Sequence, residues 1–313
     1  MASKPIPGIK QEDIESFHEF IPNCTRVLAL IGAGLSASSG LATFRGVGGL
    51  WRNHDAMQLA TPEAFQANPA LVWRFYSYRR HMALKANPNP AHYALAEYSK
   101  RMNGGFHSIS QNVDGLSPRA GHPSEYLHLV HGSLYDVKCT NFFCSYIEKG
   151  NYADPIVPAL DLPADESDPT TIDALATRQV RELDISDASV QLPEIAEKDL
   201  PHCPSCNEGL LRPGVVWFGE WLPDSVINDI DNFINAGPID LIMVIGTGAK
   251  VYPAASYVIK ARSKGARVAV INTDPDDEPP GGMKKGDWFF NGDAAAVLPE
   301  LLRPIIGELA VPT

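Results

Sequence analysis

The stretch from residue 26 to residue 46 constrains the fold of this chain more than any other. Residues 26–31 form a short aliphatic and β-branched run, which is typical of a buried parallel strand. Gly32 and Gly34 follow directly and let the backbone turn tightly and approach a ligand closely. The serine-rich residues after them predict the start of a helix, whose free N–H groups suit a pyrophosphate. The stretch therefore predicts a strand-turn-helix unit that can bind a phosphate group.

The glycine pattern alone leaves an alternative open. Gly-x-Gly-x-Ser is shorter than the complete dinucleotide fingerprint, and no acidic residue stands clearly about 20 residues further on at the end of a second strand. A glycine-rich turn without a ligand explains the pattern equally well. Phe44 and Arg45 favour a ligand, because an aromatic ring and a guanidinium group have little structural purpose directly after such a turn.

The composition favours a globular enzyme. Of 313 residues, 44% are hydrophobic and 20% are charged, as in ordinary soluble domains. The net charge of -11 argues against nucleic-acid binding, which usually needs a basic surface. No apolar run approaches the roughly 18 residues of a membrane span, and the first residues lack the apolar core of a signal peptide. We expect an intracellular protein that contacts neither nucleic acid nor membrane.

Strand-like and helix-like stretches alternate along the chain. After the first strand, residues 106–111, 126–130, 239–245 and 267–272 are typical of strands. Predicted helices cover residues 11–20, 68–85, 90–101, 224–235 and 253–264, and Thr61 is the predicted N-cap of a further helix. This alternation predicts an α/β fold with a doubly wound, Rossmann-like parallel sheet.

We divide the chain into three predicted parts. Residues 1–45, 106–135 and 215–313 should form the Rossmann-like domain, and residues 46–105 a helical insertion. Residues 136–214 should form a smaller module. Within it, residues 154–200 are rich in Asp, Glu, Pro and Thr with little apolar periodicity, and we expect a long, partly disordered acidic insertion there.

Four cysteines in two close pairs predict a metal site. They are Cys139, Cys144, Cys203 and Cys206. Two such pairs supply a tetrahedral four-sulfur zinc site, which has no open position and is therefore structural. Reduced surface thiols or two disulfides are the alternatives, and the pairing inside a non-secreted chain favours one zinc ion.

Polar residues follow each of the predicted strands. Gln111, Asn112 and Asp114 follow one strand, and His131 follows the next. Ligands of doubly wound sheets bind at the carboxyl ends of the strands, where a histidine can act as a base near neutral pH. On spacing alone an ordinary Asn/Asp turn and a structural histidine remain the stronger interpretations.

Together these motifs resemble the sirtuins, the NAD-dependent protein-lysine deacylases. The resemblance runs from about residue 25 to residue 305, in the order in which the family has its motifs. The matching motifs are Gly32-Ala-Gly-x-Ser-Ala, Thr43-Phe-Arg45, Gln111-Asn-Val-Asp114, His131-Gly132, the two cysteine pairs and Val216-Trp-Phe-Gly-Glu220.

The resemblance implies that the Rossmann-like domain binds NAD. The implied NAD-binding residues are Gly32, Ala33, Gly34, Ser36, Ala37, Thr43, Phe44, Arg45, Trp51, Gln111, Asn112, Asp114, Gly246, Thr247, Gly248, Asn272, Thr273, Asp274 and Ala294. Asn112 and Asp114 would hold the nicotinamide end. The acyl oxygen of a modified lysine would attack the ribose carbon as nicotinamide leaves, and His131 would act as general base on a ribose hydroxyl. The products would be free lysine, nicotinamide and O-acyl-ADP-ribose.

The resemblance also implies how an acyl-lysine protein substrate binds. Val216, Trp217, Phe218, Gly219 and Glu220 would pair with the substrate peptide as an added strand.

A second set of residues implies the kind of acyl group. Tyr76 and Arg79 are three apart and so lie on one helix face, where a phenol and a guanidinium can bind a carboxylate. With Ala60 they resemble the sirtuins that remove succinyl, malonyl and glutaryl groups, in which Ala60 would keep the pocket roomy. Plain deacetylation and a solvated helix face are the alternatives.

Some features depart from the family or leave other functions open. Ala42 stands where sirtuins usually have proline, and Gly248 where they usually have serine. A nicotinamide dehydrogenase, an ADP-ribosyltransferase and a non-enzymatic NAD-sensing or zinc-scaffold protein are the competing functions. We expect a monomer in the cytoplasm, with the mitochondrial matrix as the alternative compartment.

Overall fold

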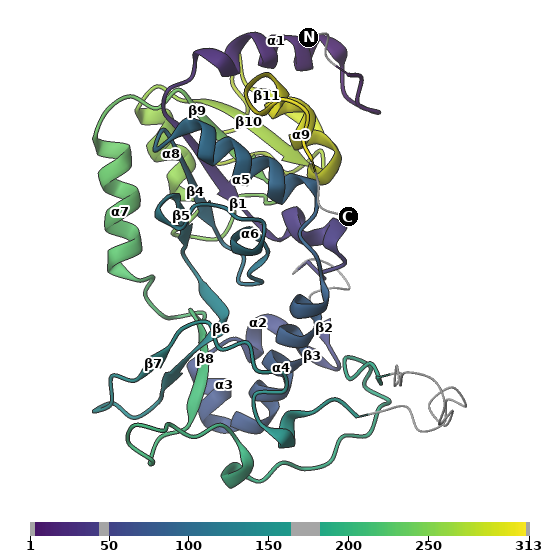
Figure 1. The fold of residues 1–313 in the computed structure, drawn as a ribbon, viewed down its shortest axis with the longest axis vertical. Helices are drawn as coiled ribbons and strands as arrows, with labels where there is room; N and C mark the ends of the chain where they lie inside the picture. Colours follow the sequence, from purple (N-terminus) through teal and green to yellow (C-terminus); the bar gives the residue numbers. More distant parts are fainter. Residues whose placement is uncertain (1–3, 44–49, 164–181, 311–313) are drawn as a thin grey trace. The chain divides into compact units, whose positions relative to one another are not determined.

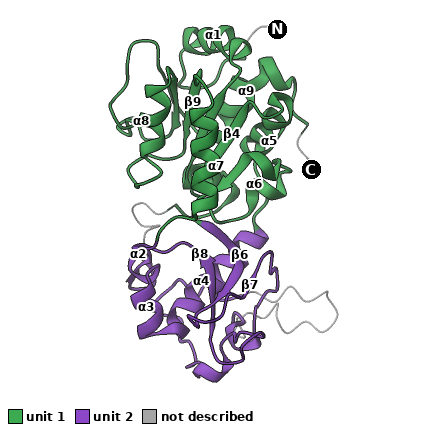
Figure 2. Ribbon diagram, turned by 90° about the vertical axis from the view of Figure 1, so that its left-hand side faces the viewer, with its two compact units in different colours: residues 1–43, 86–131, 221–313 green, residues 44–85, 132–220 purple. Residues whose placement is uncertain are grey.

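The computed structural model describes residues 4–43, 50–163 and 182–310. The chain forms two compact units (Figure 2). Unit 1 contains residues 1–43, 86–131 and 221–313, and unit 2 contains residues 44–85 and 132–220.

Unit 1 is built on a six-stranded sheet in the order β11-β10-β9-β1-β4-β5 (Figure 1). All neighbouring strands are parallel. The strands are β1 (Val27–Ile31), β4 (Phe106–Ser110), β5 (Leu127–Leu129), β9 (Leu241–Ile245), β10 (Arg267–Asn272) and β11 (Trp288–Asn291). The order runs in both directions from β1, so the predicted doubly wound sheet is confirmed.

The side chains of β1 alternate between the two faces of the sheet, which explains why helices cover both faces. Val27, Ala29 and Ile31 point into a core with α1 (Gln11–Phe20), α5 (Pro90–Met102) and α9 (Ala294–Ile306). Leu28 and Leu30 point into a second core with α7 (Asp224–Asn235) and α8 (Ser256–Ser263). Successive side chains of a strand face opposite sides, and all five residues of β1 are buried. Such a strand must have an apolar layer on each side.

The C-terminal elements were not predicted. β11 pairs with β10, and α9 contains Pro299 and Pro304 inside its helical span. Proline lacks the N–H that an internal helix position needs, and it masks the helical pattern in the sequence. The helix is stabilised instead by an apolar face, since Val297, Leu298 and Leu301 are fully buried.

Unit 2 contains a three-stranded antiparallel sheet in the order β7-β6-β8. Its strands are β6 (Gly132–Cys139), β7 (Ile147–Glu148) and β8 (Leu211–Val215), and a small hairpin is formed by β2 (Leu50–Trp51) and β3 (His54–Asp55). Its helices are α2 (Ala56–Leu59), α3 (Pro62–Ala67) and α4 (Pro69–Lys85). As predicted, the Thr61 side chain caps α3 by accepting a hydrogen bond from the Ala64 N–H.

Short helices complete the two units. Unit 1 has α6 (Leu116–Arg119) and the 3-10 helices η1 (Ile21–Asn23), η2 (Ala33–Ser39) and η4 (Ser124–Tyr126). Unit 2 has the 3-10 helices η5 (Pro158–Leu160) and η7 (Glu197–Asp199). None of the helices that the structure describes is long and apolar enough to cross a membrane.

The boundaries of the two units differ from the predicted ranges, above all at α5. We expected residues 46–105 to form one helical insertion, whereas α5 lies in unit 1 and only residues 44–85 of this region lie in unit 2. The physical reason is the apolar face of α5, because Ala91, Ala94 and Leu95 are buried in the core shared with α1 and α9. The assignment of functions to the predicted ranges stays a prediction.

The described parts of the acidic insertion are tied to the rest of unit 2. Within the insertion, the Leu183 N–H donates to the Pro163 carbonyl over 2.9 Å. His81 of α4 contacts Asp154 at 2.7 Å and Glu182 at 2.8 Å. Residues 164–181 lie outside the described part of the chain, so the expectation of partial disorder stays a prediction for them.

The turns after β1 and β9 meet backbone to backbone. The Gly34 N–H donates to the Gly246 carbonyl over 2.9 Å. A Cβ atom added at Gly34 would lie 2.6 Å from the Gly246 Cα, and one added at Gly32 would lie 2.5 Å from the Thr247 Cβ. Gly246 itself has φ +59, and its added Cβ would lie 2.5 Å from the Leu35 nitrogen. These glycines are therefore needed for contact between the two turns.

Gly246→Ala tests this contact, with Gly40→Ala as the matched control. Gly40 also has a positive φ, of +83, but a Cβ there meets nothing within 4 Å. We expect Gly40→Ala to lower the free energy of unfolding by about 1 kcal/mol through backbone strain alone. Gly246→Ala should lower it by about 3 kcal/mol, because a clash is added to the strain. Urea unfolding measures both, and equal losses would contradict the proposed close contact.

Candidate active site

Three of the predicted NAD-binding residues form a hydrogen-bonded cluster in unit 1. Ser36 lies in η2, and Asn112 and Asp114 follow β4. The Ser36 hydroxyl donates to Asp114 Oδ2 over 2.6 Å, and Asn112 Nδ2 donates to Ser36 Oγ over 3.3 Å. Asn112 Nδ2 also donates to the Gly32 carbonyl over 3.0 Å. The structure thus joins the end of β4 to the glycine turn after β1.

His131 follows β5, and its hydrogen bond defines its tautomer. The His131 Nδ1 atom lies 3.0 Å from the Gln111 carbonyl oxygen. A carbonyl oxygen only accepts, so Nδ1 carries the proton and Nε2 presents a lone pair. Burial lowers the pKa of His131 below 6.5, and the hydrogen bond to Gln111 only partly opposes this shift. A neutral imidazole with an unprotonated Nε2 is the form that a general base requires.

A second group of predicted NAD-binding residues follows strands β4, β9 and β10. Gln111 Nε2 lies 3.4 Å from the Thr247 hydroxyl oxygen, which in turn accepts the Ala249 N–H over 3.1 Å. Asn272 is buried and donates to Asp277 Oδ2 over 3.1 Å. The remaining residues of the group differ in exposure: Gly248 and Ala294 are buried, and Thr273 and Asp274 are exposed.

The other predicted NAD-binding residues lie in or after η2, in unit 2 or outside the described residues. Ala33 and Ala37 lie in η2, and Thr43 follows it. Phe44 and Arg45 lie outside the described residues. Trp51 belongs to unit 2, where its ring is 3% exposed and packs edge-on against Phe75 at 5.6 Å. Its cofactor role stays a prediction, because packing accounts for its burial.

The predicted acyl-binding residues lie together in unit 2. Tyr76 of α4 is fully buried, and its hydroxyl oxygen accepts a hydrogen bond from Trp217 Nε1 over 2.9 Å. The Arg79 guanidinium lies 5.9 Å from the Tyr76 ring centre and 5.4 Å from that of Phe75. Burial raises the pKa of Tyr76, so this phenol stays protonated near neutral pH. The Arg79 cation thus lies near the ring of a protonated tyrosine on the same face of α4.

The predicted peptide-binding segment is a turn whose backbone is partly used internally. The Phe218 N–H donates to the Ala60 carbonyl over 2.9 Å, and the Trp217 N–H donates to Glu220 Oε2 over 2.8 Å. Phe218 and Gly219 are exposed, whereas Val216 is half-buried. Two N–H groups of the segment are therefore already engaged, which narrows the part that could pair with a peptide strand.

Glu220 has a structural partner that the sequence did not indicate. Arg212 of β8 contacts Glu220 Oε1 at 2.5 Å, and its guanidinium lies 3.3 Å from the Trp217 ring centre. Hydrogen bonds from Arg212 and from the Trp217 backbone lower the pKa of Glu220 against the effect of burial. The predicted substrate residue Glu220 therefore holds Trp217, which in turn holds Tyr76.

The four cysteines converge in unit 2. Their sulfur atoms all lie within 4.8 Å of one another, with Cys139 and Cys206 at 3.7 Å and Cys144 and Cys203 at 3.8 Å. Four thiolates around a tetrahedral zinc ion, with Zn–S bonds of about 2.3 Å, would stand about 3.8 Å apart. The distances also exclude disulfides in this structure. The donor set fits one structural zinc ion.

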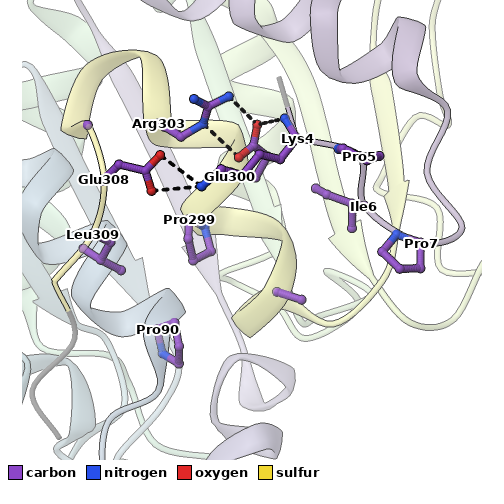
Figure 3. A pocket seen from close by; sticks show the side chains of 12 residues that line it. Lys4, Pro5, Ile6, Pro7, Pro90, Pro299, Glu300, Arg303, Glu308 and Leu309 are labelled. Carbon is purple, nitrogen blue, oxygen red and sulfur yellow. Dashed lines mark hydrogen bonds and ion pairs between the residues drawn. The ribbon is translucent and has the colours of Figure 1, made fainter. Parts of the chain in front are cut away.

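A hollow elsewhere in unit 1 contains none of the predicted NAD- or acyl-binding residues. It has a volume of about 340 Å³ and lies between the N-terminal segment and α9 (Figure 3). The charged groups around it pair with one another: the Lys4 N–H donates to Glu300, Arg303 pairs with Glu300, and the Lys4 ammonium pairs with Glu308 (Figure 3). These contacts fasten residues 4–7 to α9 and indicate a structural role.

Two residues of unit 1 that contact the predicted site were missed. His92 of α5 lies 3.4 Å from the Ser36 hydroxyl oxygen. Asp277 is 1% exposed and binds both Asn272 and Lys250. The sequence Asn89-Pro-Ala-His92 carried a signal for the first, since an N-cap residue followed by a polar side chain three positions on suggests a capping box. No comparable signal marked Asp277.

Comparison with known proteins shows the family of this chain. The Sir2 family model matches residues 32–253. An NAD-dependent protein deacylase of Candida albicans is 47% identical over 310 residues, which cover 95% of this chain and 99% of that protein. The mitochondrial NAD-dependent protein deacylase sirtuin-5 of Xenopus tropicalis is 39% identical over 84% of this chain and 77% of its own length.

A solved structure agrees as well. The crystal structure of a Sir2 homologue in complex with NAD is 31% identical, with a TM-score of 0.69 over 97% of each chain. This chain belongs to the Sir2 family, the sirtuins.

Zinc removal should unfold unit 2 before unit 1. We expect a chelator to abolish hydrogen-exchange protection of β6 and β8, because the thiolates lose their common ligand, and to leave β1 and β9 protected. Cys203→Ser should have the same effect. Cys24→Ser is the matched control, since Cys24 is buried in unit 1. Unchanged protection of β6 and β8 after chelation would contradict a structural zinc ion.

The titration of His131 can be measured directly. We expect its ring carbon signals in ¹³C NMR to titrate with a midpoint below 6.5, because burial destabilises the imidazolium. Deacylation should therefore keep its full rate down to that pH and fall as His131 gains a proton. His131→Asn supplies the assignment of the signal. A midpoint above 6.5 would contradict the neutral form that we assign to this histidine.

Proposed function

We propose that this chain is an NAD-dependent protein-lysine deacylase that prefers acyl groups ending in a carboxylate, namely succinyl, malonyl and glutaryl. Family membership supports the deacylase activity. The acyl preference rests on one observation, the Arg79 guanidinium at 5.9 Å from the ring centre of Tyr76 on α4. The products are free lysine, nicotinamide and O-acyl-ADP-ribose.

Unit 1 would hold NAD at the switch point between β1 and β9. The turns there consist of small residues, and added Cβ atoms at Gly32, Gly34 and Gly246 would fill the space between them. Polar groups with defined partners follow at Ser36 and Asp114. This combination of small residues and fixed polar side chains at the carboxyl ends of the strands fits a dinucleotide. When bound, NAD supplies an electrophilic ribose carbon with nicotinamide as the leaving group.

His131 would act as the general base on a ribose hydroxyl. Its Nδ1 proton is held by the Gln111 carbonyl, so Nε2 is the atom that accepts a proton. The lowered pKa keeps this atom unprotonated at neutral pH. Asn112 and Asp114 would bind the carboxamide of nicotinamide, since one offers an amide and the other a carboxylate.

Tyr76 and Arg79 would bind the distal carboxylate of the acyl group. The Tyr76 oxygen already accepts the Trp217 indole N–H, so its own O–H remains to donate to another acceptor. Arg79 adds the positive charge and a charge-assisted hydrogen bond. Such an anchor is needed because the chain carries a net charge of -11, which repels an acidic substrate. Ala60, whose carbonyl accepts the Phe218 N–H, would leave room for the acyl chain because its side chain is a single methyl group.

The partner and compartment assignments belong to the same proposal. The substrates would be acyl-lysine side chains of proteins, bound by a monomer. Relatives named as mitochondrial, such as the sirtuin-5 of Xenopus tropicalis, support the mitochondrial matrix, the second of the two predicted compartments.

Arg79→Met tests the acyl preference, with Arg74→Met as the matched control. Both arginines lie on α4, but five positions separate them, which places them on different helix faces. We expect Arg79→Met to lower kcat/KM for a succinyl-lysine peptide roughly 10- to 100-fold by removing a charge-assisted hydrogen bond. Activity on the acetyl-lysine peptide of the same sequence should stay within about two-fold.

Arg74→Met should leave the ratio of the two activities unchanged. Equal losses on the succinyl and acetyl peptides in Arg79→Met would contradict the carboxylate anchor. Label from NAD that remains on the protein target would indicate an ADP-ribosyltransferase instead.

A further inference from the structure

The imidazole of His92 links the N-terminus of α5 to the Ser36 cluster of unit 1. His92 is 1% exposed. Its Nδ1 atom accepts the backbone N–H of Asn89 over 3.2 Å, and its Nε2 atom lies 3.4 Å from the Ser36 hydroxyl oxygen. The Ser36 hydroxyl in turn contacts Asp114 Oδ2 at 2.6 Å. One side chain therefore connects a helix cap to the carboxylate proposed to bind nicotinamide.

The capping contact decides which nitrogen of His92 carries the proton. A backbone N–H can only donate, so Nδ1 must be unprotonated. Burial lowers the pKa of His92 to about 4, although Asp114 opposes the shift, so the ring is neutral at pH 7. A neutral ring with a free Nδ1 has its proton on Nε2. The Nε2–H group therefore donates to Ser36.

This tautomer in turn decides the direction of the Ser36 hydroxyl. A hydroxyl oxygen accepts two hydrogen bonds and donates one. The two acceptor positions are taken by His92 Nε2–H and by Asn112 Nδ2–H at 3.3 Å. Only the hydroxyl proton remains, and it lies on Asp114 Oδ2. The second carboxylate oxygen, Oδ1, accepts the Leu116 N–H over 2.9 Å. Ser36 and the Leu116 N–H thus both hold Asp114, and the contact from Ser36 depends on His92.

The same helix cap also fixes the segment that carries Ser36. Asn89 Nδ2 donates to the Leu35 carbonyl over 2.8 Å and to the Ser39 hydroxyl over 3.1 Å. Asn89 therefore holds the backbone of η2, whereas His92 contacts the Ser36 hydroxyl, which donates to Asp114. The structural and the orienting contacts come from two different side chains and can be separated by substitution.

We propose that His92 is a positioning residue for nicotinamide release, which keeps the Ser36 hydroxyl proton on Asp114 and so fixes the orientation of that carboxylate. The inference rests on the proposed function, in which Asp114 binds the nicotinamide end of NAD. His92 itself touches neither substrate in this account. Its effect should appear in kcat for nicotinamide release and not in the KM for the acyl peptide.

Two substitutions separate the contacts of His92. His92→Asn places an amide oxygen near the Nδ1 position, so it keeps the cap on Asn89 and loses the contact to Ser36. His92→Gln places an amide N–H near the Nε2 position, so it keeps the donor to Ser36 and loses the cap. We expect His92→Asn to lower kcat about ten-fold at a nearly unchanged melting temperature. His92→Gln should keep most of kcat but melt at a lower temperature.

His122→Asn is the matched control. The His122 Nε2 atom lies 3.0 Å from the Ser108 hydroxyl inside unit 1, and burial lowers the pKa of His122 to about 4 as well. Ser108 lies within β4 and is fully buried. We expect His122→Asn to change stability and not kcat. Ser36→Ala should also lower kcat, and adding His92→Asn to it should have little further effect, since both act through Asp114.

The outcomes distinguish the inference from the function on which it rests. A wild-type protein that releases no nicotinamide contradicts the proposed function. An active wild type with unchanged kcat in His92→Asn contradicts only the role of His92. A loss of kcat in His92→Gln as large as in His92→Asn, or fully additive losses with Ser36→Ala, would also overturn the inference, because His92 would then act through folding alone.

Discussion

The contact between the turns after β1 and β9 is the constraint on which unit 1 depends. Both turns stand at the point where the strand order reverses, and both consist of residues without bulky side chains. The Gly34 N–H to Gly246 carbonyl bond holds them at a separation that no Cβ would permit. The two turns lie at the edge of the sheet where dinucleotides bind in doubly wound folds. The packing of the turns and the proposed binding of NAD therefore depend on the same residues.

Two neutral histidines of unit 1 illustrate how backbone groups can define side-chain chemistry. The Gln111 carbonyl puts the proton of His131 on Nδ1, and the Asn89 N–H puts that of His92 on Nε2. Burial lowers the pKa of both rings. The first ring thus presents a lone pair, as a base must, and the second presents a donor. The amino acid is the same, and the local backbone determines the role.

The sequence predicted the central fold well because β1, β9 and β10 are strongly apolar and are followed by glycine or polar residues. The helix near residues 11–20 was also predicted, because its apolar and charged positions alternate with the helical period. The helix α9 was missed because two prolines interrupt its pattern, although burial stabilises it. β11 was missed because its four residues are too few to stand out from the surrounding loops.

At the site, the resemblance to the sirtuins identified the residues and not their partners. Tyr76 and Arg79 could be grouped by helical period alone. The indole of Trp217 that fixes Tyr76, and the Arg212–Glu220 pair that fixes Trp217, depend on contacts between residues more than 100 positions apart or on a turn without regular pattern. His92 was missed for a similar reason, because its partner Ser36 lies 56 positions earlier in the chain.

The most direct test of this account is nicotinamide release from NAD by the wild-type protein, measured with two peptides that differ only in an acetyl or a succinyl group on one lysine. The account predicts release with both peptides and a much higher kcat/KM for the succinyl peptide, because Arg79 and Tyr76 bind its carboxylate. Faster release with the acetyl peptide would contradict the carboxylate anchor, and no release with either would contradict the deacylase activity itself.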